Sequence, residues 1–171
     1  MKTLLLATAL GLITAQAQDP LSFPDPDISG KWYISAFISE TGSPVAQASP
    51  ILFTVLSSGD VRASAVYRID NQCHEVEVTL EKTGTPGKYR AFGGRSYVQV
   101  EEAPVRDYLM FYCEGQHERR FRTAKLVGRH PDVNPEALEA FKKFAQRKGL
   151  PEKDIHMPEQ MERCVPTPSH T

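Results

Sequence analysis

Histidine and cysteine are the side chains with which catalytic or metal-binding chemistry would begin in this 171-residue chain. The pair Gly93-Gly94 stands between two strand-like runs with no helix after it, so it does not match a phosphate-binding loop. No histidine is spaced with another histidine or with a cysteine as a zinc site requires. The five histidines are His74, His117, His130, His156 and His170. We therefore expect a protein that is not an enzyme and that holds neither a metal nor a cofactor.

Three cysteines give the chain its other reactive groups. In an oxidising compartment, Cys73, Cys113 and Cys164 predict one disulfide and one free thiol, and three pairings are possible. A free cysteine in a folded domain is most often buried as a small hydrophobic side chain. A nucleophilic Cys113 would need a histidine beside it in space, which the order of residues along the chain does not reveal.

The first 17 residues have the pattern of a secretory signal peptide. Lys2 precedes an apolar run over 4–13, and Ala15 and Ala17 form a small-residue cleavage site. The run is shorter than the ~20 residues that a membrane-spanning helix needs, which argues against an anchor. We expect cleavage after Ala17, one mature domain over 18–171, and a secreted, extracellular product.

The charge of the chain is nearly balanced, with a formal net value of −1. Nucleic acids and anionic membranes select a clustered basic excess, which this composition lacks. Arg119, Arg120 and Arg122 form a small basic group on an alternating run, where a solvated face is the simpler interpretation. We therefore expect no nucleic-acid partner and no insertion into a membrane.

Most of the mature chain alternates apolar with polar residues, which is the period of a β-strand. Turns rich in glycine, proline and serine separate the alternating runs. The eight predicted strands cover 32–39, 51–56, 61–69, 74–82, 89–92, 96–100, 108–114 and 119–127. Because the connections between them are short, consecutive strands should pair as antiparallel hairpins.

After the last strand the period changes to that of an amphipathic helix. Asn134 can cap this helix, and Pro135 occupies the first position, where its missing N–H costs nothing. Gly149 is placed to end it. The apolar stripe from Ala137 to Ala145 must pack on the outside of the sheet. We predict an all-β fold, an eight-stranded antiparallel up-and-down β-barrel with one C-terminal α-helix packed on the barrel. Closure of the barrel removes the exposed sheet edges and leaves room inside for one small ligand.

Four motifs follow one another in an order that carries a family resemblance. They are Gly30-x-Trp32 at the first strand, Arg106-Asp107-Tyr108 with Tyr112-Cys113 on the seventh, Leu126-Val127-Gly128-Arg129 at the end of the eighth, and the helix over 136–150. Together they resemble the lipocalin family, and within it the branch of tear lipocalin (von Ebner gland protein), odorant-binding lipocalins and related mammalian allergens. The resemblance covers essentially the whole mature chain.

The resemblance implies structural roles for five residues. Trp32 should lie across the closed end of the barrel with Arg129 packed over it, and Gly30 should let the chain turn into the first strand. Cys73 should pair with Cys164, which leaves Cys113 free; a pairing through Cys113 is the alternative. A bridge that closes a loop of roughly 92 residues would contribute about 4–5 kcal/mol on the chain-entropy model.

The inward face of each strand gives the candidate ligand-binding residues. Trp32 is placed inward, so its side of each alternating run should line an apolar cavity with few polar groups. The candidates are Ile34, Ala36, Ile38, Phe53, Val55, Ala65, Tyr67, Val76, Val78, Leu80, Phe92, Leu109, Phe111 and Cys113. Tyr67 could supply an orienting hydroxyl. The alternative is that these side chains simply fill the barrel.

As a member of such a family, the protein would be a secreted carrier that binds a small hydrophobic molecule, such as an odorant, a pheromone, a fatty acid or a retinoid-like compound. The alternative function is a protein-binding or proteinase-inhibitor-like secreted lipocalin, with a cell-surface receptor among the conceivable partners. The loop over 40–50 is rich in glycine, serine and proline, and it suits a flexible entrance to the cavity. The expected oligomeric state is a monomer or a weak dimer.

Overall fold

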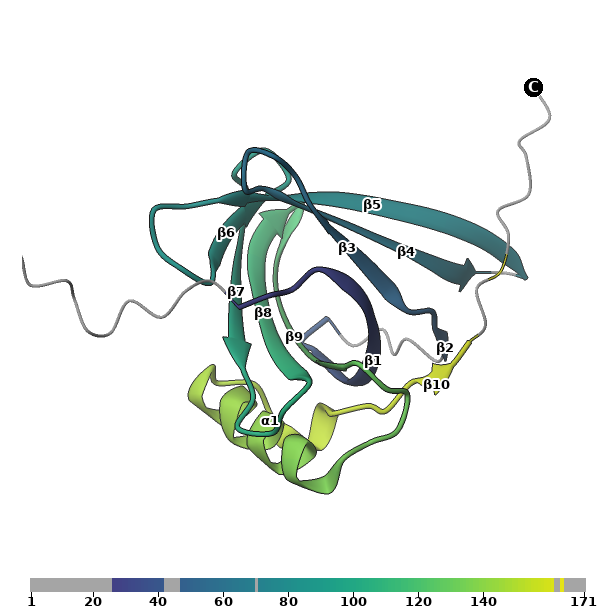
Figure 1. Ribbon diagram of the computed structural model, residues 1–171. Coiled ribbons are helices and arrows are strands. Elements are labelled where there is room, and N and C mark those ends of the chain that lie inside the picture. Colours follow the sequence, from purple (N-terminus) through teal and green to yellow (C-terminus); the bar gives the residue numbers. More distant parts are fainter. Residues whose placement is uncertain (1–25, 42–46, 70, 162–163, 165–171) are drawn as a thin grey trace, which may run out of the picture.

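The fold is described by a computed structural model that covers residues 26–41, 47–69, 71–161 and 164. The predicted signal peptide, His170 and part of the predicted entrance loop lie outside these residues. The barrel strands are β1 (Gly30–Ser39), β3 (Ile51–Val55), β4 (Val61–Ile69), β5 (Gln72–Lys82), β6 (Lys88–Ala91), β7 (Ser96–Glu102), β8 (Tyr108–His117) and β9 (Arg119–Gly128). They close into one antiparallel barrel in sequence order, which confirms the predicted fold (Figure 1).

The helix α1 (Pro135–Arg147) lies against the outer face of β8 and β9 (Figure 1). It begins as predicted: the Asn134 side chain accepts hydrogen bonds from the backbone N–H groups of Glu136 and Ala137 at 2.9 and 3.1 Å. The fully buried Phe141 and Phe144 pack with Met110 and Leu126 of the barrel wall. No helix among the described residues is long and apolar enough to cross a bilayer.

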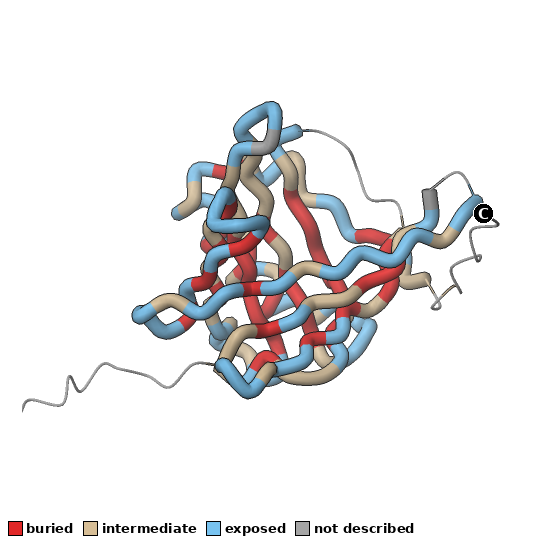
Figure 2. The backbone as a smooth tube through the Cα atoms, turned by 90° about the horizontal axis from the view of Figure 1, so that it is seen from above, coloured by how far each residue is buried: buried red, intermediate tan, exposed pale blue. Residues whose placement is uncertain are grey.

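The strands covered by the helix differ from those opposite. Over 108–112 of β8 and 124–128 of β9 both faces are largely buried, because the inner face points into the barrel and the outer face meets α1. On β4 and β5 most outer side chains are exposed, and Arg62 and Glu77 form a surface ion pair at 3.3 Å. The exception is Val66 of β4, which is buried beside Ser49. Figure 2 shows the buried segments in red toward the centre of the molecule and the exposed segments in blue on its outer parts.

Three short elements were not predicted from the sequence: β2 (Gln47–Ala48), the 3-10 helix η1 (Glu152–Asp154) and β10 (Glu159–Gln160). The last of these pairs with β2 in a parallel two-stranded sheet that lies beside β1. The chain beyond it is tied to the barrel by a disulfide between Cys73 on β5 and Cys164. This is the predicted pairing, and Cys113 is the free cysteine.

Candidate functional site

An apolar chamber of about 160 Å³ lies inside the barrel. Its side chains come from strands on all sides, since alternate residues of every strand point to the barrel axis. The rings of Phe53 on β3 and Phe111 on β8 stack across the interior, with their centres 5.4 Å apart and their planes nearly parallel. Below this stack the interior is filled by other buried side chains, so the two rings form part of the floor of the chamber.

Most of the predicted ligand-binding residues border this chamber. They are Phe53, Ala65, Tyr67, Val76, Val78, Leu80, Phe92, Phe111 and Cys113. Phe92 is not in a strand; it has a positive φ of 53° in the turn after β6, and half of its surface is exposed. Val76 is also partly exposed at 41%. These two side chains give the chamber an apolar, solvent-facing border.

A β-bulge reverses the predicted direction of two residues on β1. Between Ile34 and Ala36 the pairing of β1 with β9 shifts by one residue, and a shift of one residue sends later side chains to the opposite face. Ala36 and Ile38 therefore pack with α1 outside the barrel, and Phe37, which was expected to point outward, joins the interior. The expectation that Ala36 and Ile38 line the cavity is wrong.

Three other candidates lie near the chamber without bordering it. Leu109 is buried in the interior cluster that contains Trp32 and Val127. Ile34 borders a neighbouring hollow described below. Val55 is 51% exposed where β3 ends, so it is not an interior residue. Barrel ends explain this last difference, because alternation gives the direction of a side chain and not its depth.

The structure adds a polar group that sequence reasoning missed. Lys125 and Thr123 point inward from β9 and border the chamber, together with Ile51, Ala63, Ser64, Ala91, Val98 and Val127. Of all the side chains around the chamber, Lys125 is the one with a formal charge. None of the ion pairs among the described residues involves it. The sequence signal for an inward-facing Lys125 was its position two residues before the apolar Val127 on the same predicted strand.

The free thiol of Cys113 faces the same chamber. Burial raises the pKa of Cys113, and the nearby Lys125 opposes this effect only in part. Because the thiolate is the reactive form, the buried thiol is a weak nucleophile near neutral pH. Among the described residues, no group of three histidine, cysteine or acidic side chains is placed to hold a metal ion.

The closed end of the barrel is built around the single tryptophan. The Arg129 guanidinium lies 3.7 Å from the centre of the Trp32 ring, and its Nη1 donates to the Lys31 carbonyl at 3.2 Å. The Trp32 Nε1 donates to the Ile28 carbonyl at 3.0 Å. Gly30 has a φ of 95°, and a Cβ there would lie 3.0 Å from Nη1 of Arg129. The pair is arranged as the resemblance implied, and the glycine makes room for it.

A charged link joins the C-terminal end of β1 to the end of the helix. Arg122 on β9 forms an ion pair with Glu40, directly after β1, and donates to the Lys148 and Gly149 carbonyls at 2.7 and 3.3 Å. It thus satisfies carbonyls that the C-terminus of α1 leaves free. The hydrogen bond from Arg122 lowers the pKa of Glu40. Arg122 was expected on a solvated face, and it instead fixes the start of the entrance loop.

Comparison with known proteins agrees with this architecture. Residues 29–162 match the model of the lipocalin / cytosolic fatty-acid binding protein family. The chain is 44% identical to vomeronasal secretory protein 1 of Mus musculus, over 97% of this chain and 93% of the relative. It is 37% identical to von Ebner gland protein 2 of Rattus norvegicus, over 96% and 97%. It is 35% identical to odorant-binding protein 2a of Mus musculus, over 96% and 98%.

Proposed function

Because the chain belongs to the lipocalin family, we propose that it is a secreted carrier of a small amphiphilic molecule, held in the chamber above the Phe53–Phe111 stack. The observation that carries the proposal is the chamber itself, an apolar space inside the barrel with few polar groups around it. Affinity would come mainly from apolar area removed from water, on the order of 25 cal/mol per Å² before the costs of binding. Binding would be by partition, without a chemical step.

The polar groups of the chamber suggest how the cargo lies. Lys125 and Tyr67 stand on the same side, next to the hollow behind Phe37, whereas Phe53 and Phe111 form the floor. Within the part of the chain that the structure describes, Lys125 has no acidic partner, and a cationic group in an apolar space favours an anionic ligand group beside it. We therefore infer that the cargo has an apolar body toward the aromatic rings and an acidic or strongly polar head at Lys125.

Secretion is part of the proposal. The Cys73–Cys164 disulfide is typical of an oxidising compartment, and one relative is named a secretory protein. The predicted signal peptide over 1–17 would direct the chain there. The name of odorant-binding protein 2a states a cargo class for that relative, and an odorant of suitable size is one candidate for this chain.

The test compares two neighbouring residues on opposite faces of β5. Val78 borders the chamber, and Thr79 points to solvent. Val78→Phe fills the space with an aromatic ring, and Thr79→Phe adds the same bulk outside. In titrations with the fluorophore N-phenyl-1-naphthylamine, we expect Val78→Phe to bind at least about tenfold more weakly, or ~1.4 kcal/mol, and Thr79→Phe to match the parent. If the parent does not bind the fluorophore, or both variants bind equally, the carrier proposal is wrong.

A further inference from the structure

A seam opens in the barrel wall where β1 leaves β3. The two strands pair only from Gly30 to Trp32 of β1, and β1 then follows β9 through the bulge. Above Trp32, the edge of β1 that faced β3 has no barrel strand beside it. The other border of the seam is fixed, because the Ser49 hydroxyl accepts a hydrogen bond at 2.9 Å from the Val66 backbone N–H on β4.

A C-terminal strap, defined here as residues 155–161, lies in this seam. His156 exchanges two backbone hydrogen bonds of 2.8 Å with Phe37 of β1, and Gln160 Nε2 donates to the Ile34 carbonyl at 2.8 Å. On its other side the strap pairs through β10 with β2, and the Met161 N–H donates to the Ala48 carbonyl at 3.0 Å. The strap thus takes the place of a missing strand between β1 and β2.

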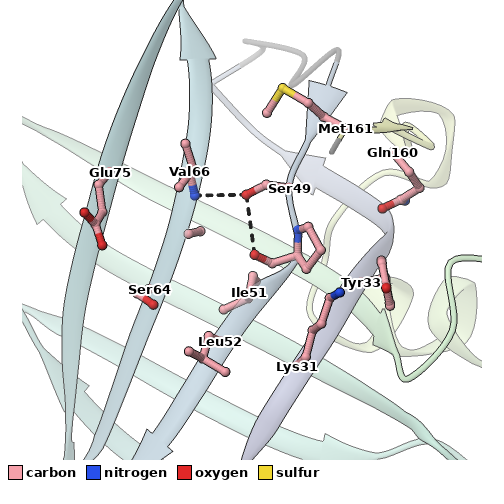
Figure 3. A pocket seen from close by; sticks show the side chains of 12 residues that line it. Lys31, Tyr33, Ser49, Ile51, Leu52, Ser64, Val66, Glu75, Gln160 and Met161 are labelled. Atoms are coloured by element: carbon pink, nitrogen blue, oxygen red, sulfur yellow. Dashed lines mark hydrogen bonds between the residues drawn. The ribbon is translucent and has the colours of Figure 1, made fainter. Parts of the chain in front are cut away.

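Hollows lie on both sides of the strap. Behind it, a space of about 200 Å³ is bordered by the buried Pro158 and shares Tyr67 and Lys125 with the ligand chamber. Outside the barrel, a groove of about 490 Å³ runs over β1, β3 and β4, with Gln160 and Met161 at its edge (Figure 3). The strap is therefore a thin partition between solvent and the interior.

The strap has a firm side and a weak side: its hydrogen bonds to β1 are short, at 2.8 Å, whereas its contact with β2 is limited. The pairing of the strap with β2 spans two residues. The hydrogen bond beside this pairing, from Gln47 Nε2 to Glu159 Oε2, is long, at 3.5 Å. Gln160 Oε1 is buried without a hydrogen-bond donor among the described residues, which lowers the cost of moving it to water. Elements with few buried contacts and exposed hydrogen bonds open more readily than the whole fold. Beyond the strap, the disulfide from Cys164 to Cys73 limits its travel.

We propose that the ligand passes through this lateral seam, and that the strap is its gate, which opens when β10 parts from β2. The outer groove is then the vestibule, because it shares Ile51, Ser64 and Ala65 with the chamber. The exposed Leu52 in the groove suits an apolar ligand body, and Lys31, whose ammonium lies over the Tyr33 ring at 5.1 Å, suits an acidic head. Glu75 borders the groove on the β5 side. The proposal rests on the carrier function and names the route to the chamber.

The experiment locks the gate with a reversible crosslink. In a Cys73→Ser/Cys164→Ser background, Gln47→Cys and Glu159→Cys place thiols on paired residues of β2 and β10, whose separation suits a disulfide. A control places the same pair on β4 and β5, as Arg62→Cys and Thr79→Cys, which are strand partners away from the seam. Stopped-flow fluorescence follows N-phenyl-1-naphthylamine as it is bound and as excess decanoic acid displaces it, before and after reduction.

The expected result is kinetic. The Cys73→Ser/Cys164→Ser protein should exchange the fluorophore faster than the parent, and the oxidised lock should slow both association and dissociation at least about tenfold relative to its reduced form. The equilibrium affinity should change by less than about threefold, since a gate alters rates in both directions alike. The oxidised and reduced control should behave alike.

Two results would overturn the gate. Equal rates in the oxidised and reduced lock would mean that the ligand uses the barrel mouth bordered by Phe92 and Val76. A slower dissociation alone, with correspondingly tighter binding, would mean that the crosslink stabilises the complex and controls no passage. The carrier proposal is tested separately by whether the parent binds the fluorophore at all, so a failed gate leaves it intact.

Discussion

Lys125 is the residue that most directly tests the proposed acidic head of the cargo. Lys125→Met keeps an unbranched apolar side chain, one atom shorter than lysine, and removes its charge. The Lys125 ammonium lies 6.0 Å from the Phe37 ring centre, which is at the outer limit of a cation–π contact. The charge therefore gains little from its protein surroundings, and a ligand carboxylate would be its main partner.

The size of the effect follows from this isolation. A hydrogen bond to a charged group contributes about 1.5–3 kcal/mol, and the side chain is only half buried, which places the expected loss at the lower end of that range. We expect Lys125→Met to weaken decanoic acid by about 10–30-fold, near 1.4–2 kcal/mol. Decanol, which has the same chain and no charge, should change by less than about threefold, because its binding depends on apolar area.

The assay is displacement of N-phenyl-1-naphthylamine by the two ligands at neutral pH. Lys88→Met is the matched control, because Lys88 is an exposed residue of β6 and its loss changes the net charge equally. That variant should bind both ligands as the parent does. Equal losses for decanoic acid and decanol in Lys125→Met, or no loss for either, would refute an acidic head at Lys125.

Two further predictions concern the barrel ends. Gly30→Ala should lower the free energy of unfolding by about 1–3 kcal/mol, because a Cβ at its positive φ crowds Arg129. Thermal unfolding followed by the fluorescence of the single tryptophan should show a lower Tm for this variant. Gly84→Ala is the control and should keep the Tm of the parent, because the space around Gly84 is open. The pKa of Glu40 is lowered by its hydrogen bond from Arg122, so this ion pair stabilises the fold above the ordinary glutamate pKa of about 4.3 and is lost as pH falls through the lowered value. In urea unfolding at a series of pH values, the parent should lose stability as the pH falls, by less than about 1 kcal/mol for so exposed a pair. Glu40→Gln should not show this loss of stability. Identical pH profiles for parent and variant would show that the pair contributes nothing.

Alternation along the chain was enough to predict the barrel and much of the chamber. Phe53, Tyr67 and Phe111 face inward because their strands are regular over several residues. The same rule failed at Ala36 and Ile38, since the bulge that turns them outward depends on how β1 pairs with β9. Nothing local in the sequence of β1 marks that shift.

The strap and Lys125 were missed for different reasons. The strap has no periodic pattern. The hydrogen bonds that position it join residues more than 100 positions apart in the sequence, such as Gln160 of the strap and Ile34 of β1. Lys125 belongs to a strand whose neighbouring arginines suggested a solvated face. Only the closure of the barrel, with α1 on its outside, shows that this strand is buried on both faces.

The helix on β8 and β9 also divides the chamber mechanically. Behind Phe111 and Lys125 stand the barrel strand and then α1, whereas behind Val78 on β5 there is a single layer of sheet, whose outer residue Thr79 is exposed to solvent. A bulkier cargo would therefore be accommodated by outward movement of β5, while the wall that carries Phe111 and Lys125 keeps its shape. The protein would contact the head group of its ligand through the rigid, helix-backed wall and accommodate variation in the ligand body through the more deformable wall opposite.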